Sequence, residues 1–197
     1  MMSILPKVVL FFIFIKLHYL VFYAFFPVFH TFFIICAIFS IILGSISAIY
    51  QIKIKRMLTY SMITNSGFLI LVLSLGNLNS IHVGVFYLFS YLLITAGIFI
   101  TILCLRERSN NFIFKNINSL VNLYEINPAL AFSFFIFLFS IAGIPPLLGF
   151  YTKFFVFLSC IKNGLFFIPI LIVFLSIISI FYYIRLTKLM FFTRTRN

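Results

Sequence analysis

The sequence predicts an all-α protein: a polytopic bundle of transmembrane helices with about six spans, one of them discontinuous near residues 143–149. Hydrophobic residues make up 64% of the 197 residues and charged residues only 8%, and the mean hydropathy is +1.28. No soluble domain has this balance, so the chain is an integral membrane protein. Long apolar runs separated by short turns are typical of membrane-spanning helices.

Six apolar runs are each long enough to cross a bilayer core of about 30 Å with some tilt. They cover about residues 4–25, 31–50, 57–76, 81–105, 128–161 and 164–187. Turn residues separate them, and the polar stretch 106–127 has room for a short interfacial helix. We therefore expect one transmembrane domain over residues 1–197.

The first span carries three titratable groups, Lys7, Lys16 and His18. By position alone, Lys7 is typical of a membrane-surface anchor, and Lys16 of a side chain that extends to the far surface. His18, beside Tyr19, is typical of an interfacial anchor, with a proton relay as the alternative.

The third and fourth spans carry small and polar side chains. Ser61 and Asn65 lie in the third span, and Ser90 and Thr95 in the fourth. Such faces pack helices closely or hydrate a channel, and packing is the commoner use. Ser61 and Asn65 are therefore candidates for a proton relay as well as for packing.

The run 128–161 is too long for one straight span. As a single helix it would measure about 50 Å at 1.5 Å per residue. Gly143, Pro145, Pro146 and Gly149 lie in its middle, and proline interrupts a helix because it lacks a backbone donor and clashes with the preceding turn. A break at membrane depth is tolerated only where it is buried in protein or lines a wet cavity.

Lys153 follows this break inside the apolar run. A charge at such depth costs about 2.5–3.5 kcal/mol on an insertion scale. The alternative, a lysine that extends to the surface from a helix end, does not suit its depth. Because desolvation disfavours the ammonium form, a buried lysine can gain and lose a proton. The break and the lysine together predict an ion-transport element.

The formal net charge is +12, and the basic residues lie mainly at the ends of apolar runs. This placement points to orientation in a membrane rather than to nucleic-acid binding. Alternating the spans leaves only Lys16 and Lys162 on one side. The other side collects ten: Lys53, Lys55, Arg56, Arg106, Arg108, Lys115, Arg185, Lys188, Arg194 and Arg196. The positive-inside rule puts these ten in the cytoplasm or, for a mitochondrially made protein, in the matrix.

No other chemistry is indicated by the sequence. The cysteines Cys36, Cys104 and Cys160 are far apart and lack metal-ligand spacing, so we interpret them as packing residues. There is no glycine-rich phosphate loop and no nucleophile–base pair. We therefore expect no metal and no redox cofactor in this chain.

Three segments together resemble a known family. Residues 50–68, YQIKIKRMLTYSMITNSGF, are similar to the Q-x-x-I-K-R-x-L-A-Y-S-S-I-x-H-x-G-Y signature of antiporter-like membrane subunits. Residues 142–154, AGIPPLLGFYTKF, resemble the proline segment of NADH–ubiquinone oxidoreductase chain 2, and residues 182–185, YYIR, resemble the end of its next helix. A lysine in the broken helix favours chain 2 over chain 4, which usually has a glutamate there.

The resemblance implies a proton-translocating subunit in the membrane arm of respiratory complex I, the mitochondrial NADH:ubiquinone oxidoreductase. It implies that Lys153 and Lys7 carry protons, driven by redox chemistry in other subunits that hold flavin and iron–sulfur clusters. The expected location is the mitochondrial inner membrane, with the C-terminus on the matrix side. A cation/proton antiporter subunit and a non-pumping structural membrane subunit are the alternatives.

The family pattern also has parts that this chain lacks. The resemblance is good over about residues 45–190 and does not include the preceding half of the family, which holds an essential glutamate. Asn65 stands where the family usually has a histidine. The chain is therefore expected to correspond to the later half of chain 2, from a split or reduced gene, with other membrane-arm subunits and lipids as partners. One of these subunits would supply the missing preceding helices.

Overall fold

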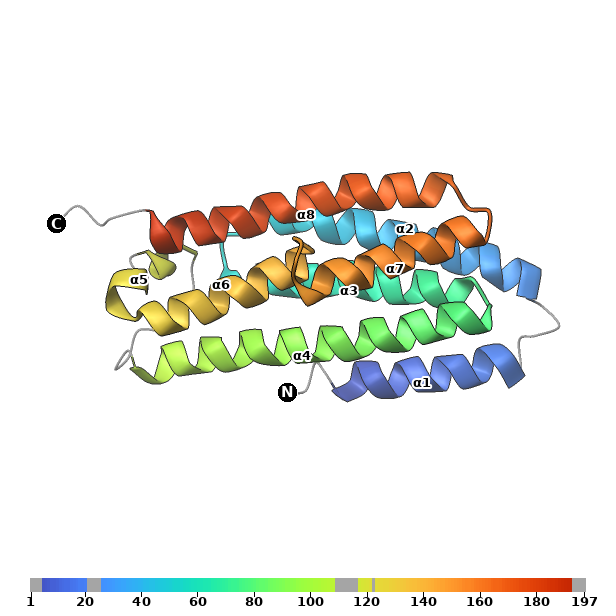
Figure 1. The fold of residues 1–197 in the computed structure, drawn as a ribbon, viewed down its shortest axis with the longest axis horizontal. Coiled ribbons are helices and arrows are strands. Elements are labelled where there is room, and N and C mark those ends of the chain that lie inside the picture. The colour runs from blue at the N-terminus through green and yellow to red at the C-terminus, as the bar shows by residue number, and fades with distance from the viewer. Residues whose placement is uncertain (1–4, 21–25, 109–116, 122, 193–197) are drawn as a thin grey trace.

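The computed structural model describes residues 5–20, 26–108, 117–121 and 123–192, which form a bundle of helices with nearly aligned axes (Figure 1). The helices are α1 (Leu5–Leu20), α2 (Phe26–Ile49), α3 (Ile54–Ser74), α4 (Leu78–Arg108), the short 3-10 helix η2 (Ile117–Leu120), α5 (Leu123–Ile126), α6 (Pro128–Ala142), α7 (Leu148–Lys162) and α8 (Phe167–Phe191). The predicted all-α class is confirmed.

Within the described residues, four helices are long and apolar enough to span a membrane: Phe29–Ile49, Ile54–Ser74, Leu78–Leu105 and Phe167–Phe191. The run that was too long for one span forms two helices, α6 and α7, of 15 residues each. Each is about 22 Å long at 1.5 Å per residue, which is shorter than a bilayer core of about 30 Å, so neither spans the core alone. The predicted discontinuous helix is confirmed.

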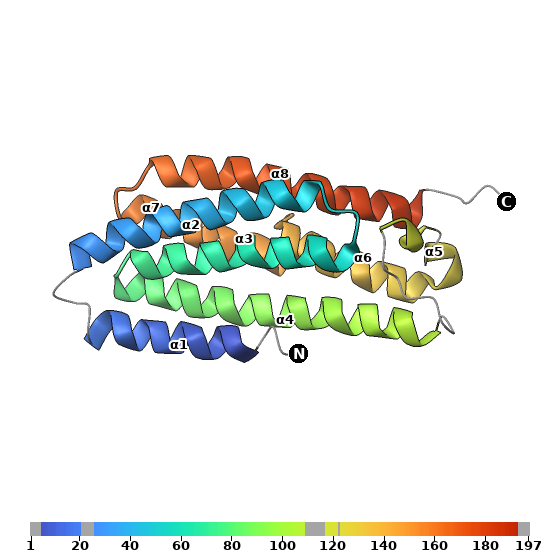
Figure 2. The same ribbon diagram turned by 180° about the vertical axis from the view of Figure 1, so that it is seen from behind.

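The first predicted span contains α1, a helix of 16 residues. The remainder of that span, residues 21–25, lies outside the described residues. Figure 2 shows that α1 runs alongside only part of α4. The polar stretch 106–127 contains two short helices, η2 and α5, where the sequence left room for one.

The junction between α6 and α7 is buried only at its two ends: Ala142 and Gly149 are buried, whereas Pro145 and Pro146 are exposed. Helix α4 contacts both α6 and α7, while α3 packs against α2, α4 and α7, and α8 contacts α2, α6 and α7. In Figure 1 the junction lies near the middle of the bundle's long axis. Neighbouring helices therefore cover the two ends of the break but not its prolines. A non-helical backbone at membrane depth needs protein or a wet cavity around it.

Helices α2 and α3 make the most extensive contact among the described helices, and small residues allow it. A Cβ atom added to Gly67 would lie 2.3 Å from Ser40 Oγ and 2.7 Å from Ile41 Cγ1. A Cβ atom on Gly44 would lie 2.4 Å from Thr64 Oγ1. Small residues let helix backbones approach, so part of the small, polar face of α3 serves packing.

The described basic residues are distributed unevenly between the two ends of the bundle. Lys53, Lys55 and Arg56 lie around the start of α3, at the same end of the bundle as the end of α8, whose last turns hold Arg185 and Lys188 (Figure 1). Arg185 also donates a hydrogen bond from Nη1 to the Ile49 carbonyl oxygen at the end of α2, at 3.5 Å. The side of the membrane that this end faces stays a prediction.

Candidate functional site at the helix break

Helix α6 ends in a left-handed turn at Gly143, whose φ is +85°. The Gly143 N–H donates to the carbonyl oxygens of Phe139 and Ser140, both at 3.1 Å, and the Ile144 N–H donates to Phe139 at 3.2 Å. Glycine adopts this conformation without steric cost, and the bonds satisfy carbonyls that a helix end leaves open. Pro145 and Pro146 follow and cannot continue the helix.

The start of α7 lies directly against the end of α6. A Cβ atom added to Gly149 would lie only 1.7 Å from the carbonyl oxygen of Ser140, so no other residue fits there without movement of the backbone. The Gly149 N–H donates to Ser140 Oγ at 3.4 Å. The two half-helices are therefore held in contact at their backbones.

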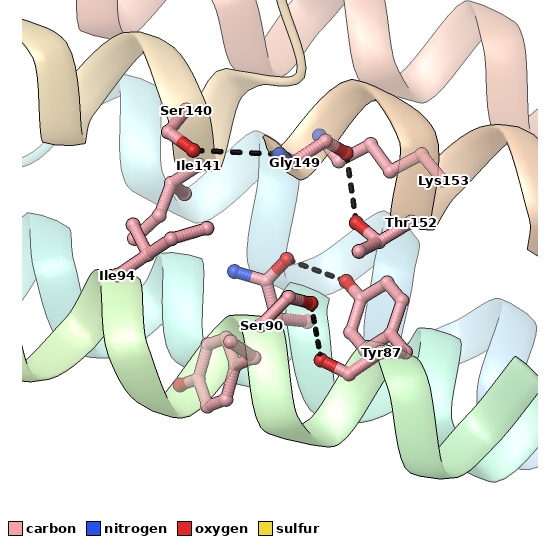
Figure 3. Close-up of a pocket in the computed structure, with 10 residues that line it drawn as sticks. Tyr87, Ser90, Ile94, Ser140, Ile141, Gly149, Thr152 and Lys153 are labelled. Carbon is pink, nitrogen blue, oxygen red and sulfur yellow. Dashed lines mark hydrogen bonds between the residues drawn. The ribbon is translucent and has the colours of Figure 1, made fainter. Parts of the chain in front are cut away.

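The Lys153 side chain runs back along α7 to the break (Figure 3), and its Nζ donates to the Ala142 carbonyl oxygen at 2.7 Å. Ala142 is the last residue of α6. The carboxyl end of a helix carries partial negative charge, which stabilises a cation. The partly buried ammonium also lies 5.8 Å from the centroid of the Phe68 ring, within range of a cation–π interaction.

Gly143 also makes room for this lysine. A Cβ atom at position 143 would lie 2.9 Å from Lys153 Cδ and 3.2 Å from Lys153 Nζ. The lack of a side chain at Gly143 therefore serves two purposes: it permits the left-handed turn, and it lets the lysine stem lie across that turn.

A small cavity of about 10 Å³ lies beside Lys153 and is lined by residues of α3, α4, α6 and α7. This volume is close to the smallest that admits one water molecule. Figure 3 shows the two sides of the cavity facing each other, with Thr152 and Lys153 on α7 opposite Tyr87 and Ser90 on α4. Its lining is Asn65, Tyr87, Ser90, Tyr91, Ile94, Ser140, Ile141, Gly149, Thr152 and Lys153.

The polar side chains around the cavity are oriented by hydrogen bonds. The Tyr87 hydroxyl donates to Asn65 Oδ1 at 2.8 Å, and Asn65 Nδ2 donates to the Ser61 carbonyl oxygen at 2.8 Å. Thr152 Oγ1 donates to the Gly149 carbonyl oxygen at 2.8 Å. Each of these hydroxyls uses its proton and keeps acceptor lone pairs, so the site combines one amine with several fixed hydroxyl and amide groups.

The structure brings together most of the residues selected from the sequence. Gly143, Gly149, Lys153 and Asn65 meet at the break, and Ser61 lies one helical turn from Asn65 on α3. The roles of Ser61 and Asn65 in a relay stay predictions. The backbones of Lys7 and His18 lie in α1, but their side chains are outside the described part of the chain.

Three groups at the site were not selected from the sequence: the Ala142 carbonyl, the tyrosines Tyr87 and Tyr91, and Thr152. Tyr87, Ser90 and Tyr91 share a helical face at spacings of three and four residues, which is the signal that could have identified the tyrosines. Thr152 precedes Lys153 directly. In the residues that the structure covers, no three His, Cys, Asp or Glu side chains lie close enough together to hold a metal ion.

Comparison with known proteins gives one family over most of the chain. Residues 1–179 match the transmembrane family described as NADH:quinone oxidoreductase/Mrp antiporter. NADH-quinone oxidoreductase subunit N of Rhodospirillum rubrum is 37% identical over 153 residues, which is 78% of this chain and 31% of that protein. NADH-ubiquinone oxidoreductase chain 2 of Marchantia polymorpha is 40% identical over 153 residues, 78% of this chain and 30% of that protein.

The fold is similar to that of a chain in the structure of respiratory complex I from Thermus thermophilus with bound aureothin. The TM-score is 0.69 at 29% sequence identity, over 82% of this chain and 36% of that chain. The present chain thus spans about a third of the length of the curated relatives that it matches.

Proposed function

Because the chain belongs to the NADH:quinone oxidoreductase/Mrp antiporter family of membrane proteins, we propose that it acts in the proton-translocating membrane arm of an NADH:ubiquinone oxidoreductase. The observation that carries this proposal is the position of Lys153. Its ammonium contacts the last carbonyl of α6, at a helix break and beside a small polar cavity. An ionisable side chain enclosed in a membrane bundle typically marks an ion pathway.

Lys153 would hold a proton and release it. In the charged state, the Ala142 carbonyl, the carboxyl end of α6 and the Phe68 ring all stabilise the ammonium. In the neutral state those interactions weaken, and the desolvation cost of the charge disappears. Two states of similar free energy are what a proton carrier needs, and the hydroxyl groups around the cavity offer partners for the transfer.

The energy for net transport must come from elsewhere. Moving one proton against 100 mV costs about 2.3 kcal/mol. We propose that electron transfer in partner subunits that hold flavin and iron–sulfur clusters drives this step, while the present chain holds no redox cofactor. Lys7 would be a second proton site, by its match to the family motif.

We place the protein in the mitochondrial inner membrane, with its C-terminus in the matrix and other membrane-arm subunits as neighbours. One neighbour would supply helices equivalent to the part of the relatives that this chain does not match. The plant relative named as a chain 2 and the basic residues at one end of the bundle support this placement. Relatives from bacteria are similarly close.

A second candidate function is a subunit of a cation/proton antiporter that works without redox coupling. The family that matches the chain includes Mrp antiporters, and this is the observation that favours it. Copurification with flavin and iron–sulfur proteins would support the first function over the second. A purely structural role for the subunit is a third alternative, which the following experiment addresses.

The test is Lys153→Met in the assembled complex, reconstituted into vesicles. Methionine keeps the long unbranched shape and removes the charge, so the subunit should insert and assemble. Membrane potential and NADH oxidation are measured together, and we expect proton pumping to fall to a small fraction of that of the wild type. Lys153→Arg should also impair pumping, because arginine does not release its proton at accessible pH.

The matched control is Lys162→Met, which removes an exposed lysine from the last turn of the same helix. It should leave pumping unchanged. Pumping at the wild-type level in both Lys153 variants would show that this lysine is structural, and the proposed function would lose its main support.

A further inference from the structure

The phenol of Tyr183 on α8 is buried, but its hydroxyl lacks a hydrogen-bond partner among the described residues. The residue is only 1% exposed, and its hydroxyl has no hydrogen-bond partner within the part of the chain that the structure describes. A buried hydroxyl without a partner is costly, and most such groups in proteins bind a side chain, a backbone group or an ordered water. The Tyr183 hydroxyl therefore needs an explanation that packing alone does not give.

The surroundings of this hydroxyl are polar on one side. The hydroxyls of Ser61 and Tyr182 lie close to it without meeting the geometry of a hydrogen bond. Ser61 Oγ donates its own proton to the Leu58 carbonyl oxygen at 2.7 Å, so it offers lone pairs to a further donor. The phenol of Tyr91 lies within electrostatic range of Tyr183, and Tyr91 also lines the cavity beside Lys153.

These groups connect Tyr183 to the cavity. Asn65 lines the cavity and is bonded to the backbone of Ser61, one turn earlier on the same face of α3. One helical turn rises about 5.4 Å, a distance that one or two water molecules can bridge. A sequence of polar groups thus leads from Lys153 through the cavity and past Ser61 to Tyr183.

Beyond Tyr183, toward the start of α3 and the end of α8, most of the described buried side chains are apolar. Thr187, one turn after Tyr183, is also buried, and its hydroxyl donates to the Ile184 carbonyl oxygen at 2.9 Å. Met57 and Leu58 lie one turn before Ser61, and Leu186 and Met190 lie one and two turns after Tyr183. All four are at most 3% exposed and belong to the same core cluster as Tyr183. A mostly apolar layer, in which Thr187 is a buried polar side chain, therefore separates Tyr183 from the end of the bundle.

We infer that the Tyr183 hydroxyl binds a water molecule and relays protons between the Lys153 cavity and the basic end of the bundle. This inference rests on the proposed function. In each transfer the phenol oxygen takes a proton from one neighbour and releases its own to the next, so the residue is unchanged afterwards and no other reactant is needed. The apolar layer beyond it would have to hydrate for protons to go further.

The test is Tyr183→Phe in the assembled complex, because it removes only the oxygen. If the hydroxyl has no role, loss of an unpartnered buried polar group should leave thermal stability equal or higher and pumping unchanged. If it is a relay, thermal stability should again be equal or higher, but the pumping rate should fall several-fold. The infrared band of a weakly bonded internal water, identified by exchange into D2O, should also disappear.

Tyr151→Phe is the matched control, since Tyr151 lies on the outer surface of α7 at 49% exposure. It should change neither pumping nor the infrared band. Wild-type pumping in Tyr183→Phe would overturn the inference. Failure of this variant to assemble would also overturn it, since that would assign the hydroxyl a structural bond within the bundle. If Lys153→Met abolishes pumping while Tyr183→Phe does not, the relay falls and the proposed function stands.

Discussion

Replacement of Gly149 by alanine tests the contact between the two half-helices. The added Cβ would lie 1.7 Å from the Ser140 carbonyl oxygen and 2.7 Å from the Ser140 carbonyl carbon. These are backbone atoms of α6, so no rotamer change can relieve the overlap. The break must open, which moves the Ala142 carbonyl away from Lys153 or shifts α7 along α4.

The expected cost follows from two opposing effects. Overpacking in a tight core costs about 1–3 kcal/mol. Because the added Cβ would overlap backbone atoms, the cost of Gly149→Ala should lie near the upper end of this range. Alanine regains up to about 1 kcal/mol of helix propensity relative to glycine. The net loss is about 2 kcal/mol, which corresponds to a decrease of about 4–8 °C in melting temperature for a chain of this size.

The assay is thermal inactivation and aggregation of the detergent-solubilised complex, together with proton pumping in vesicles. Gly84→Ala is the control. It lies in α4, and its nearest obstacle is the edge of the Phe11 ring at 3.0 Å, which can give way. The control should retain wild-type stability. If Gly149→Ala melts at the wild-type temperature and pumps normally, α6 and α7 are not held as the close contact implies.

Two further substitutions test helix packing and the polar contacts of the site. Gly67→Ala should lower the free energy of unfolding by about 1–3 kcal/mol, because its Cβ would lie 2.3 Å from Ser40 Oγ on α2. Adding Ser40→Ala should recover part of this loss. If thermal melts show no recovery, the loss does not come from the clash with Ser40. Asn65→Leu should cost about 1–3 kcal/mol by leaving the buried Tyr87 hydroxyl without its acceptor. Adding Tyr87→Phe should then restore stability in the same melts, whereas an Asn65→Leu variant as stable as the wild type would show that this bond contributes little.

Much of the architecture is a consequence of composition and local chemistry. The long apolar runs predict helices because a bilayer offers no hydrogen bonds to an open backbone. Gly143, Pro145 and Pro146 predict the break because their effects on the chain are local: a left-handed turn and missing backbone donors. Lys153 is conspicuous in the sequence for the same reason, as a charge in an apolar run has a cost that does not depend on its neighbours.

The partners of these residues were decided by tertiary structure. Nothing in the sequence indicates that Lys153 bonds to the Ala142 carbonyl, because that carbonyl is free only after the helix ends and the next one folds back against it. The Tyr87–Asn65 bond joins α3 and α4, and it depends on how side-chain packing sets the axial positions of two helices. The burial of the Tyr183 hydroxyl beside Ser61 has the same origin. The sequence by itself determined that there is a break with a charge beside it. The three-dimensional packing decided which groups that charge can reach, since helix crossings bring together residues far apart in the chain.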